Sequence, residues 1–172
     1  MPWEVFVTVG TTRFEELIKA ADSHAVAEAL SRHSYGRLVM QIGTGLYKPR
    51  CLVPTGTSAR HPSGLEVAFF DFLPSLKQQM AAADLVISHA GSGSIFEALA
   101  MRKPLIAVPN PILMHNHQAQ LVDHLAAMNH CIPATVDSLA QVLSDLQLGQ
   151  LQPYMPGDSS SIVRRIDEIA AC

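Results

Sequence analysis

Short apolar runs alternate with amphipathic segments along this 172-residue chain, and this alternation restricts the possible folds more than any other feature. It is typical of repeated βαβ units, in which a helix returns the chain to the start of the next parallel strand. We predict one α/β domain with a Rossmann-like parallel sheet of about six strands and helices on both faces. The expected strands are Val5–Val9, Leu38–Ile42, Glu66–Phe70, Leu85–Ser88, Leu105–Val108 and His130–Pro133.

The segments between these strands carry apolar residues at helical spacing. The expected helices are Arg13–Ala21, Ala25–His33, Pro74–Ala82, Gly93–Met101, Asn116–Asn129 and Ser138–Leu148. A last amphipathic helix is expected at Ser160–Ala171, where Ile162, Ile166 and Ile169 share one face with Ala170.

Two stretches interrupt the alternation. Residues Tyr47–Gly64 are rich in Pro, Gly, Ser and Thr, which predicts a long surface loop. Residues Gln150–Asp158 contain two prolines and a glycine, which predicts a linker before the last helix. We therefore divide the chain into a domain over residues 1–149 and a linker with a C-terminal helix over residues 150–172.

Composition excludes several classes of protein. The net charge of −3 and the isoelectric point of about 6.2 provide no basic surface for nucleic acid. The three cysteines, Cys51, Cys131 and Cys172, are too scattered for a disulfide framework, so we expect free thiols in a reducing compartment. The N-terminus lacks a basic start, and Val5–Val9 is too short for a signal sequence or a membrane span. These features predict a cytoplasmic protein.

The segment from Ser88 to Glu97, SHAGSGSIFE, predicts a strand, a glycine-containing loop and the start of a helix. Gly91 and Gly93 allow a tight turn and a close approach of the backbone to a ligand, and the helix directs its unpaired N–H groups at that ligand. The pattern predicts an anion site, most simply for a nucleotide diphosphate, with the His89 imidazole beside it. Alternatively, both glycines serve only the turn.

The loop fits neither common nucleotide-binding fingerprint. Phe96 stands where the dinucleotide pattern G-x-G-x-x-G needs a third small residue, and the loop follows the fourth expected strand instead of the first. The Gly-Lys-Ser/Thr ending of a phosphate-binding P-loop is also missing. The pattern therefore does not favour a dinucleotide-dependent oxidoreductase.

Glu97 has two possible roles. A carboxylate at the end of this segment can accept hydrogen bonds from the two hydroxyls of a ribose. Ser94-x-x-Glu97 also has the spacing of a capping box, in which the same carboxylate would bind a backbone N–H of its own helix. The residues alone leave both roles open.

Two further junctions should lie at the same carboxyl edge of the sheet. After the first strand, Gly10, Thr11 and Thr12 offer hydroxyls and N–H groups, although Thr12-x-x-Glu15 also has capping-box spacing. After the fifth strand, Asn116, His117 and Gln118 open a helix. Asn116 suits an N-cap, and the Gln118 amide can bind adjacent sugar hydroxyls.

A metal site is not expected. His115 and His117 are close in sequence, but no carboxylate or thiolate cluster accompanies these two imidazoles.

Several of these motifs, taken in order, resemble the asparagine-linked glycosylation family of UDP-GlcNAc transferase subunits. The resemblance covers about Val5 to Leu125. It is carried by Val5–Thr12, Leu38–Gly43, Ala83–Ser94, and Lys103–Leu105 together with Met114–Gln118.

The resemblance implies a fold equivalent to the C-terminal, donor-binding half of a GT-B glycosyltransferase. It also implies that the loop from Gly91 to Ser94, with Ser92 and Gly93, holds the diphosphate of UDP-GlcNAc. His89 would help to stabilise that diphosphate, Glu97 would bind the ribose and Gln118 would recognise the sugar. No cofactor is implied, because UDP-GlcNAc is a substrate and no metal is expected.

The implied reaction is the β-1,4 transfer of GlcNAc from UDP-GlcNAc to dolichyl-diphosphate-linked GlcNAc, with inversion at the anomeric carbon. A GT-B active site lies between two domains, so the acceptor half must come from another chain. The family uses a membrane-anchored subunit, of the asparagine-linked glycosylation protein 14 type, at the cytosolic face of the endoplasmic reticulum. The last helix would either dock on that subunit or pack on its own sheet. A non-catalytic UDP-sugar-binding regulator remains an alternative.

Overall fold

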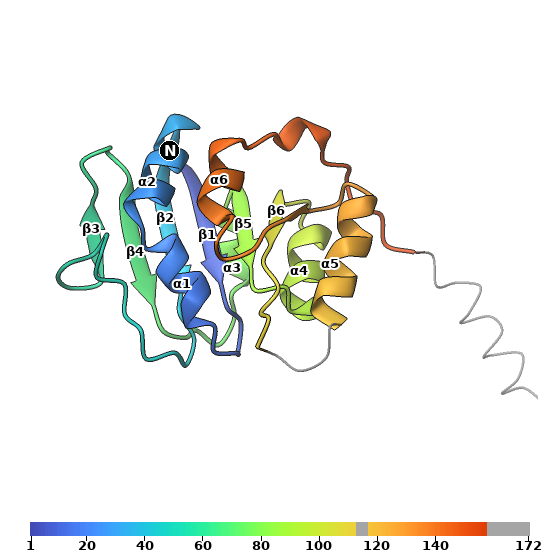
Figure 1. Ribbon diagram of the computed structural model, residues 1–172, viewed down its shortest axis with the longest axis horizontal. Helices are drawn as coiled ribbons and strands as arrows, with labels where there is room; N and C mark the ends of the chain where they lie inside the picture. The colour runs from blue at the N-terminus through green and yellow to red at the C-terminus, as the bar shows by residue number, and fades with distance from the viewer. Residues whose placement is uncertain (113–116, 158–172) are drawn as a thin grey trace, which may run out of the picture.

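The computed structural model describes residues 1–112 and 117–157. A seven-stranded sheet forms the middle of the molecule, with strand order β3-β4-β2-β1-β5-β6-β7 (Figure 1). Every strand pair is parallel except β3–β4, which is antiparallel. The strands are β1 (Trp3–Thr8), β2 (Tyr35–Gln41), β3 (Ser58–Arg60), β4 (Glu66–Phe70), β5 (Leu85–Ser88), β6 (Leu105–Ala107) and β7 (Ile132–Pro133).

Helices cover both faces of this sheet (Figure 1). Helices α1, α2 and α6 pack on one face, and α3, α4 and α5 pack on the other. The helices are α1 (Glu15–Ala21), α2 (His24–Arg32), α3 (Lys77–Ala82), α4 (Ser92–Ala100), α5 (His117–Ala127) and α6 (Leu139–Ser144), followed by the 3-10 helix η1 (Leu148–Gln150). The predicted α/β fold is thus confirmed.

The central strand β1 is buried on both sides, as parallel strands between two helical layers are. Val5 and Val7 face the core beneath α1, α2 and α6, whereas Phe6 faces the core beneath α3, α4 and α5. This arrangement explains why the strand is a continuous apolar run without polar alternation.

The sheet has one strand more than the sequence predicts. The additional strand, β3, pairs only with β4 and lies within the segment 47–64 that we expected to be a surface loop. Leu52 and Val53 of the same segment are buried in the core beneath α1 and α2. Because the segment is rich in polar residues, its composition predicts neither the strand β3 nor the burial of Leu52 and Val53.

A single buried carboxylate fixes the start of this segment. Asp22, at the C-terminal end of α1, accepts a hydrogen bond of 2.7 Å from Tyr47 Oη. It also accepts bonds of 2.8–2.9 Å from the backbone N–H groups of Arg50, Cys51 and Leu52. Because a buried carboxylate with four donors is well satisfied, Asp22 orders a loop that composition predicts to be loose.

The topology reverses direction beside β1. From β1 the chain moves to β2 and β4 on one side, and it then returns to β5, β6 and β7 on the other. In such open sheets, ligands bind at the carboxyl ends of the strands that flank the reversal, here β1 and β5. This carboxyl edge is at the bottom of Figure 1.

The opposite, amino edge carries the beginning of the chain and the segment around Gln152. Trp3 begins β1 there, and Gln152 donates a backbone hydrogen bond to Asn129 beyond the end of α5. Tyr154 then packs against His130. The expected helix at Ser160–Ala171 lies outside the described residues. No helix among those described is long and apolar enough to cross a membrane.

Candidate functional site

A cavity of about 720 Å³ opens at the topological reversal. We call it the glycine-loop cavity. It is lined by residues that follow β1, β4, β5 and β6, namely Gly10, Thr11, Thr12, Phe72, Leu73, Pro74, Ser75, Leu76, His89, Gly91, Ser92, Gly93, Ser94, Glu97 and Gln118. The structure thus brings together ten of the twelve residues that sequence analysis selects.

The N-terminus of α4 supplies hydrogen-bond donors to this cavity. Gly91 is the N-cap and has no side chain with which to cap the helix. The first intrahelical bond runs from Ile95 N to Gly91 O, so the N–H groups of Ser92, Gly93 and Ser94 have no partner within the helix. These three groups and the positive end of the helix dipole suit an anionic ligand.

The two glycines of the loop do not make the turn. The left-handed residue is Ala90, with φ of 63°, whereas Gly91 has φ of −68°. Gly91 instead leaves room for the imidazole of His89, because a Cβ at this position would lie 2.8 Å from His89 Cε1. Gly93 has open space where its Cβ would be. The turn-only role for both glycines is therefore wrong.

The imidazole of His89 is packed between two loops. It also contacts Gly10, where an added Cβ would lie 2.7 Å from His89 Cε1. Burial lowers the pKa of His89 below its usual range, so the ring is neutral at pH 7. Its Nδ1 atom is buried without a hydrogen-bond partner among the described residues. His89 can therefore serve a diphosphate as a neutral hydrogen-bond donor.

Glu97 does not cap its helix. Because α4 begins at Ser92, Ser94 is its third residue and Glu97 lies in the second turn. The capping-box alternative for Ser94 and Glu97 is thus wrong. The partly exposed Glu97 side chain lines the cavity and accepts no hydrogen bond from the described residues. Its carboxylate remains available to a ligand.

The second proposed capping box is also wrong. The N-cap of α1 is Phe14, and Thr12 Oγ1 donates to Val9 O at 2.8 Å instead of capping the helix. Glu15 accepts a hydrogen bond from the backbone N–H of Leu46. Thr12 therefore closes the turn after β1, while the exposed Thr11 lines the cavity.

A fully buried amide beneath the cavity supports two of its walls. Gln41 Oε1 accepts hydrogen bonds from Thr8 Oγ1 at 2.7 Å and from Val9 N at 3.1 Å. Gln41 Nε2 donates to Gly10 O at 2.8 Å and to Asp71 O at 3.3 Å. One side chain thus holds the loop after β1 and the loop after β4.

Sequence analysis missed the wall that follows β4. Phe72–Leu76 line the cavity, and the Phe72 side chain is 58% exposed. These residues follow an apolar strand and are themselves mostly apolar, so they resemble core residues in the sequence. The Phe-Leu-Pro run after a strand that ends at the ligand edge is the signal that could have found them.

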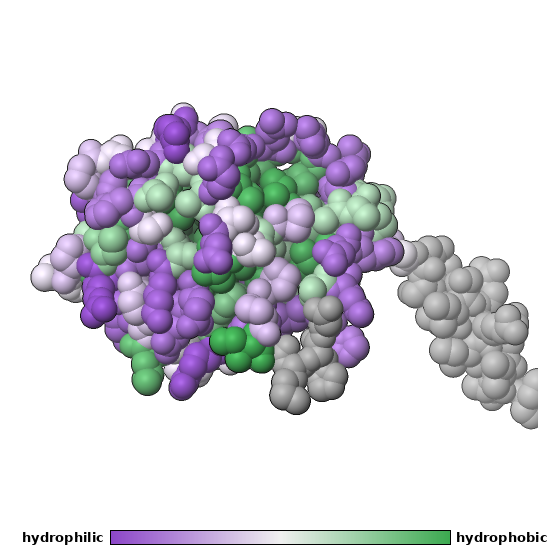
Figure 2. All heavy atoms as spheres, in the orientation of Figure 1, coloured by the Kyte–Doolittle hydropathy of each residue, from purple (hydrophilic) through white to green (hydrophobic). Residues whose placement is uncertain are grey.

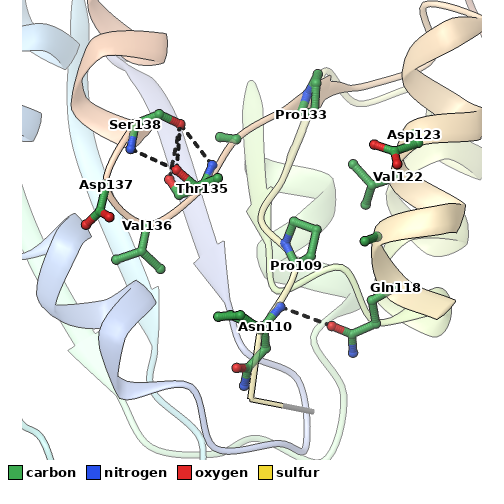
Figure 3. A pocket seen from close by; sticks show the side chains of 13 residues that line it. Pro109, Asn110, Gln118, Val122, Asp123, Pro133, Thr135, Val136, Asp137 and Ser138 are labelled. Atoms are coloured by element: carbon green, nitrogen blue, oxygen red, sulfur yellow. Dashed lines mark hydrogen bonds between the residues drawn. The ribbon is translucent and has the colours of Figure 1, made fainter. Parts of the chain in front are cut away.

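Of the described residues expected after the fifth strand, only Gln118 lines the glycine-loop cavity. Its Oε1 accepts a hydrogen bond of 3.2 Å from Asn110 N (Figure 3). This bond holds the first turn of α5 against the segment that follows β6. His117 is exposed at the first position of α5 and does not line the cavity, and Asn116 lies outside the described residues.

A second cavity, of about 710 Å³, is shown in Figure 3 and shares Gln118 with the first. We call it the β7 cavity. It lies between α5 and the loop that joins β7 to α6, and it is lined by Pro109, Asn110, Pro111, Gln118, Ala119, Val122, Asp123, Pro133, Ala134, Thr135, Val136, Asp137 and Ser138. Within the described ranges, no group of three His, Cys, Asp or Glu side chains in either cavity or elsewhere could hold a metal ion.

The fold and the glycine-loop cavity define a parallel α/β domain built to bind a ligand at its carboxyl edge. Residues 4–169 match the model of the glycosyltransferase family 28 C-terminal domain. The chain belongs to this family.

Its relatives include UDP-N-acetylglucosamine transferase subunits named ALG13. The subunit of Eremothecium gossypii is 30% identical over 190 residues, which cover 98% of this chain and 94% of the fungal protein. The human subunit is 39% identical over 131 residues, which cover 76% of this chain but only 11% of the human protein. The chain therefore corresponds to nearly the whole fungal relative and to a small part of the human one.

Solved structures agree with this relationship. An NMR structure of ALG13 is similar over 95% of this chain and 94% of its own, with a TM-score of 0.69 and 27% identity. Solved Streptomyces glycosyltransferases share 18–19% identity and TM-scores of 0.52–0.54, and the similarity covers 35–43% of their chains. The latter likeness concerns the fold alone, which matches about one half of a two-domain GT-B enzyme.

Proposed function

We propose that this chain is the donor-binding subunit of a UDP-GlcNAc transferase. The observation that carries the proposal is the convergence of the α4 N-terminus, the Glu97 carboxylate and the Gln118 amide on one cavity. These groups match, in order, a diphosphate, a ribose and a sugar. The names of the relatives supply the identity of the nucleotide sugar.

The proposed pose extends along the carboxyl edge of the sheet. The base lies against Phe72 and Leu73, whose apolar surfaces suit a planar ring. The ribose hydroxyls donate to Glu97, and the diphosphate accepts from the N–H groups of residues 92–94. The sugar reaches Gln118, and Thr11 lies beside it.

The hydrogen-bond donors of the cavity also determine how the UDP leaving group is stabilised. Negative charge develops on UDP as the anomeric bond breaks, and N–H groups already aimed at that charge lower the barrier. In the neutral tautomer that carries its proton on Nε2, His89 would add a further donor. We propose that these groups replace a metal ion, so that transfer continues in the presence of a chelator.

The proposed reaction is the inverting β-1,4 transfer of GlcNAc to dolichyl-diphosphate-linked GlcNAc. The acceptor hydroxyl attacks the anomeric carbon from the face opposite UDP, and the bonding electrons leave with the diphosphate. We propose that the acceptor half is a membrane-anchored subunit of the asparagine-linked glycosylation protein 14 type, and the naming of the relatives as transferase subunits supports such a partner. We propose that the complex acts at the cytosolic face of the endoplasmic reticulum.

Exposed apolar side chains on the ligand edge support such a partner. Leu46, Phe72 and Ile112 follow β2, β4 and β6 and are 79%, 58% and 72% exposed. Figure 2 shows apolar groups at the lower edge of the visible face, where these strands end in Figure 1. A second domain across this edge would cover them.

A titration of the full chain tests the donor assignment. UDP-GlcNAc, UDP-glucose and NAD are added separately while the heat of binding and the backbone amide shifts are followed. We expect UDP-GlcNAc to bind most tightly and to shift the amides of Ser92, Gly93 and Ser94. A preference for NAD, or no binding of any of the three, would contradict the proposal.

Adding the membrane partner and a dolichyl-diphosphate-GlcNAc acceptor tests the transfer. We expect product that is β-linked and formed equally with and without EDTA. Binding of UDP-GlcNAc with no transfer in the complete mixture would instead identify a UDP-sugar-binding regulator.

A further inference from the structure

A buried asparagine lies against Gln118 at the ligand edge. Asn110 follows β6 and is only 7% exposed. Its neighbours Pro109 and Pro111 have no backbone N–H, so the N–H of Asn110 is the one backbone donor in residues 109–111. Because a backbone N–H that is removed from water without a partner is costly, this group needs an acceptor. Gln118 Oε1 provides it at 3.2 Å (Figure 3).

This bond fixes which way the Gln118 amide is turned. A backbone N–H can donate to Oε1 but not to the NH2 group, so a reversed amide would set donor against donor and leave the Asn110 N–H unpaired. Oε1 therefore faces Asn110, and Nε2 lies on the other side of the amide group (Figure 3). Nε2 has no hydrogen-bond partner among the described residues, and the side chain lines the glycine-loop cavity. The amide thus has two N–H donors to offer to a ligand.

The side chain of Asn110 holds the backbone that carries this N–H. Its Oδ1 accepts a hydrogen bond of 3.1 Å from Ile112 N, two residues further on, which closes an Asx turn. Its Nδ2 donates to Arg13 O at 3.5 Å, between β1 and α1. One side chain therefore ties the segment after β6 to its own turn and to the segment after β1.

Asn110 and Gln41 support different parts of the glycine-loop cavity. Gln41 joins the loops after β1 and β4, next to the wall proposed for the base, whereas Asn110 joins the segments after β1 and β6, next to Gln118. Asn110 does not itself line the cavity. We propose that Asn110 is a positioning residue for sugar recognition, which fixes the Gln118 amide so that Nε2 donates to an acceptor oxygen of the donor sugar. This inference rests on the proposed function, in which the sugar reaches Gln118.

UDP and UDP-GlcNAc together separate this role from a general support of the fold. UDP has the base, the ribose and the diphosphate, but it has no sugar for Gln118 to bind. A residue that acts only through Gln118 therefore affects the binding of UDP-GlcNAc and leaves the binding of UDP unchanged. The ratio of the two affinities is the quantity to measure.

The experiment titrates the full chain with UDP and with UDP-GlcNAc by calorimetry. Asn110→Ala removes both side-chain bonds, and we expect it to weaken UDP-GlcNAc binding about three- to tenfold, the effect of one misplaced hydrogen bond, with UDP affinity unchanged. Asn110→Ser keeps an oxygen that can accept from the N–H two residues further on. It should therefore recover part of the lost affinity.

A double-mutant cycle tests whether Asn110 acts through Gln118. Gln118→Ala should weaken UDP-GlcNAc binding at least as much as Asn110→Ala does, and the two changes together should have no further effect. Thr135→Ala is the matched control, because the exposed Thr135 closes a turn at the same edge by accepting from Ser138 N at 3.1 Å, and it lies outside the glycine-loop cavity. It should leave both affinities unchanged.

Three results would overturn the inference while the nucleotide site stands. They are equal losses of UDP and UDP-GlcNAc affinity in Asn110→Ala, wild-type affinity of Asn110→Ala for both ligands, and a full further loss when Asn110→Ala is added to Gln118→Ala. If Asn110→Ala does not fold, Asn110→Ser should show a smaller loss that is again confined to UDP-GlcNAc. If UDP and UDP-GlcNAc both fail to bind the wild-type chain, the proposed function itself is wrong.

Discussion

The side chain of Gln41, the last residue of β2, donates a hydrogen bond of 2.8 Å to the backbone carbonyl of Gly10 in the loop after β1. The same amide group reaches Asp71 O, one residue before Phe72. The wall proposed for the base and the loop after β1 are therefore held by one buried side chain. Changes at Gln41 should alter donor binding without removing any group that touches the donor.

Replacing Gln41 with Glu should lower both stability and donor affinity in a pH-dependent way. A buried carboxylate would face two carbonyl oxygens and lose two donated bonds, which costs about 2 kcal/mol or more at pH 7. Burial raises the folded-state pKa of such a Glu above its unfolded value, so stability should recover as pH falls from the folded pKa towards the unfolded one. Urea unfolding and UDP titration at pH 5 and pH 8 check this.

Gln147→Glu serves as the control for that experiment, since Gln147 is exposed and lies beyond α6. It should show no comparable pH dependence. Equal UDP affinity of Gln41→Glu and wild type at pH 8 would show that Gln41 does not position the site.

Replacing Glu97 with Gln should leave stability nearly unchanged and weaken UDP binding by at least about tenfold. Glu97 lies in the second turn of α4 and does not cap it, so the helix loses nothing. The amide is a poorer acceptor for two ribose hydroxyls than the carboxylate, and a hydrogen bond to a charged group contributes about 1.5–3 kcal/mol. Calorimetric titration measures the loss, with the exposed helix residue change Glu28→Gln as control. Unchanged affinity would rule out the ribose contact.

Alanine at the two loop glycines should affect two different properties, stability at Gly91 and UDP binding at Gly93. Gly91→Ala places a Cβ against the His89 ring and should destabilise the fold by about 1–3 kcal/mol. Gly93→Ala meets no protein atom, so it should fold normally and obstruct the diphosphate. Thermal unfolding and UDP titration separate the two effects. The double change Gly91→Ala with His89→Ala should recover much of the stability, and failure to do so would mean that the clash is not the cause.

His89 should make the protein less stable in mild acid. Its folded-state pKa is depressed by burial, so the unfolded chain binds more protons below about pH 6.5. Stability should therefore fall as pH drops from about 6.5 towards the folded pKa, and His89→Gln should remove part of this dependence. Urea unfolding at several pH values measures it, with the exposed His124→Gln as control. A pH dependence identical to that of wild type would contradict this account.

The sequence predicted most of the fold because parallel strands buried on both faces are apolar throughout. The bounds of β4 and β5 match the expected strands Glu66–Phe70 and Leu85–Ser88. Strand β3 was missed because its register depends on pairing with β4 and on the anchoring of its segment by Asp22, a residue far away in the sequence. Such long-range contacts leave no local pattern.

The candidate site likewise has parts that the sequence predicts and parts that it does not. Ten of the selected residues line one cavity, because the topology alone carries three loops to one edge. The capping boxes were wrong because spacing does not determine where a helix begins, and α4 begins two residues before Ser94. The support from Gln41 could not be predicted, since a glutamine in an apolar strand gives no sign of its partners.

The described chain begins at the side of the sheet opposite the ligand edge, because Trp3 opens β1 there (Figure 1). Additional polypeptide attached to Met1 therefore starts from an edge remote from both cavities. The domain is thus suited to serve as a module within a much longer protein, as the small share of the human relative that it matches illustrates. An affinity tag or a surface tether at Met1 should leave the cavities open to ligands, so the proposed binding of UDP-GlcNAc can be measured on an immobilised chain.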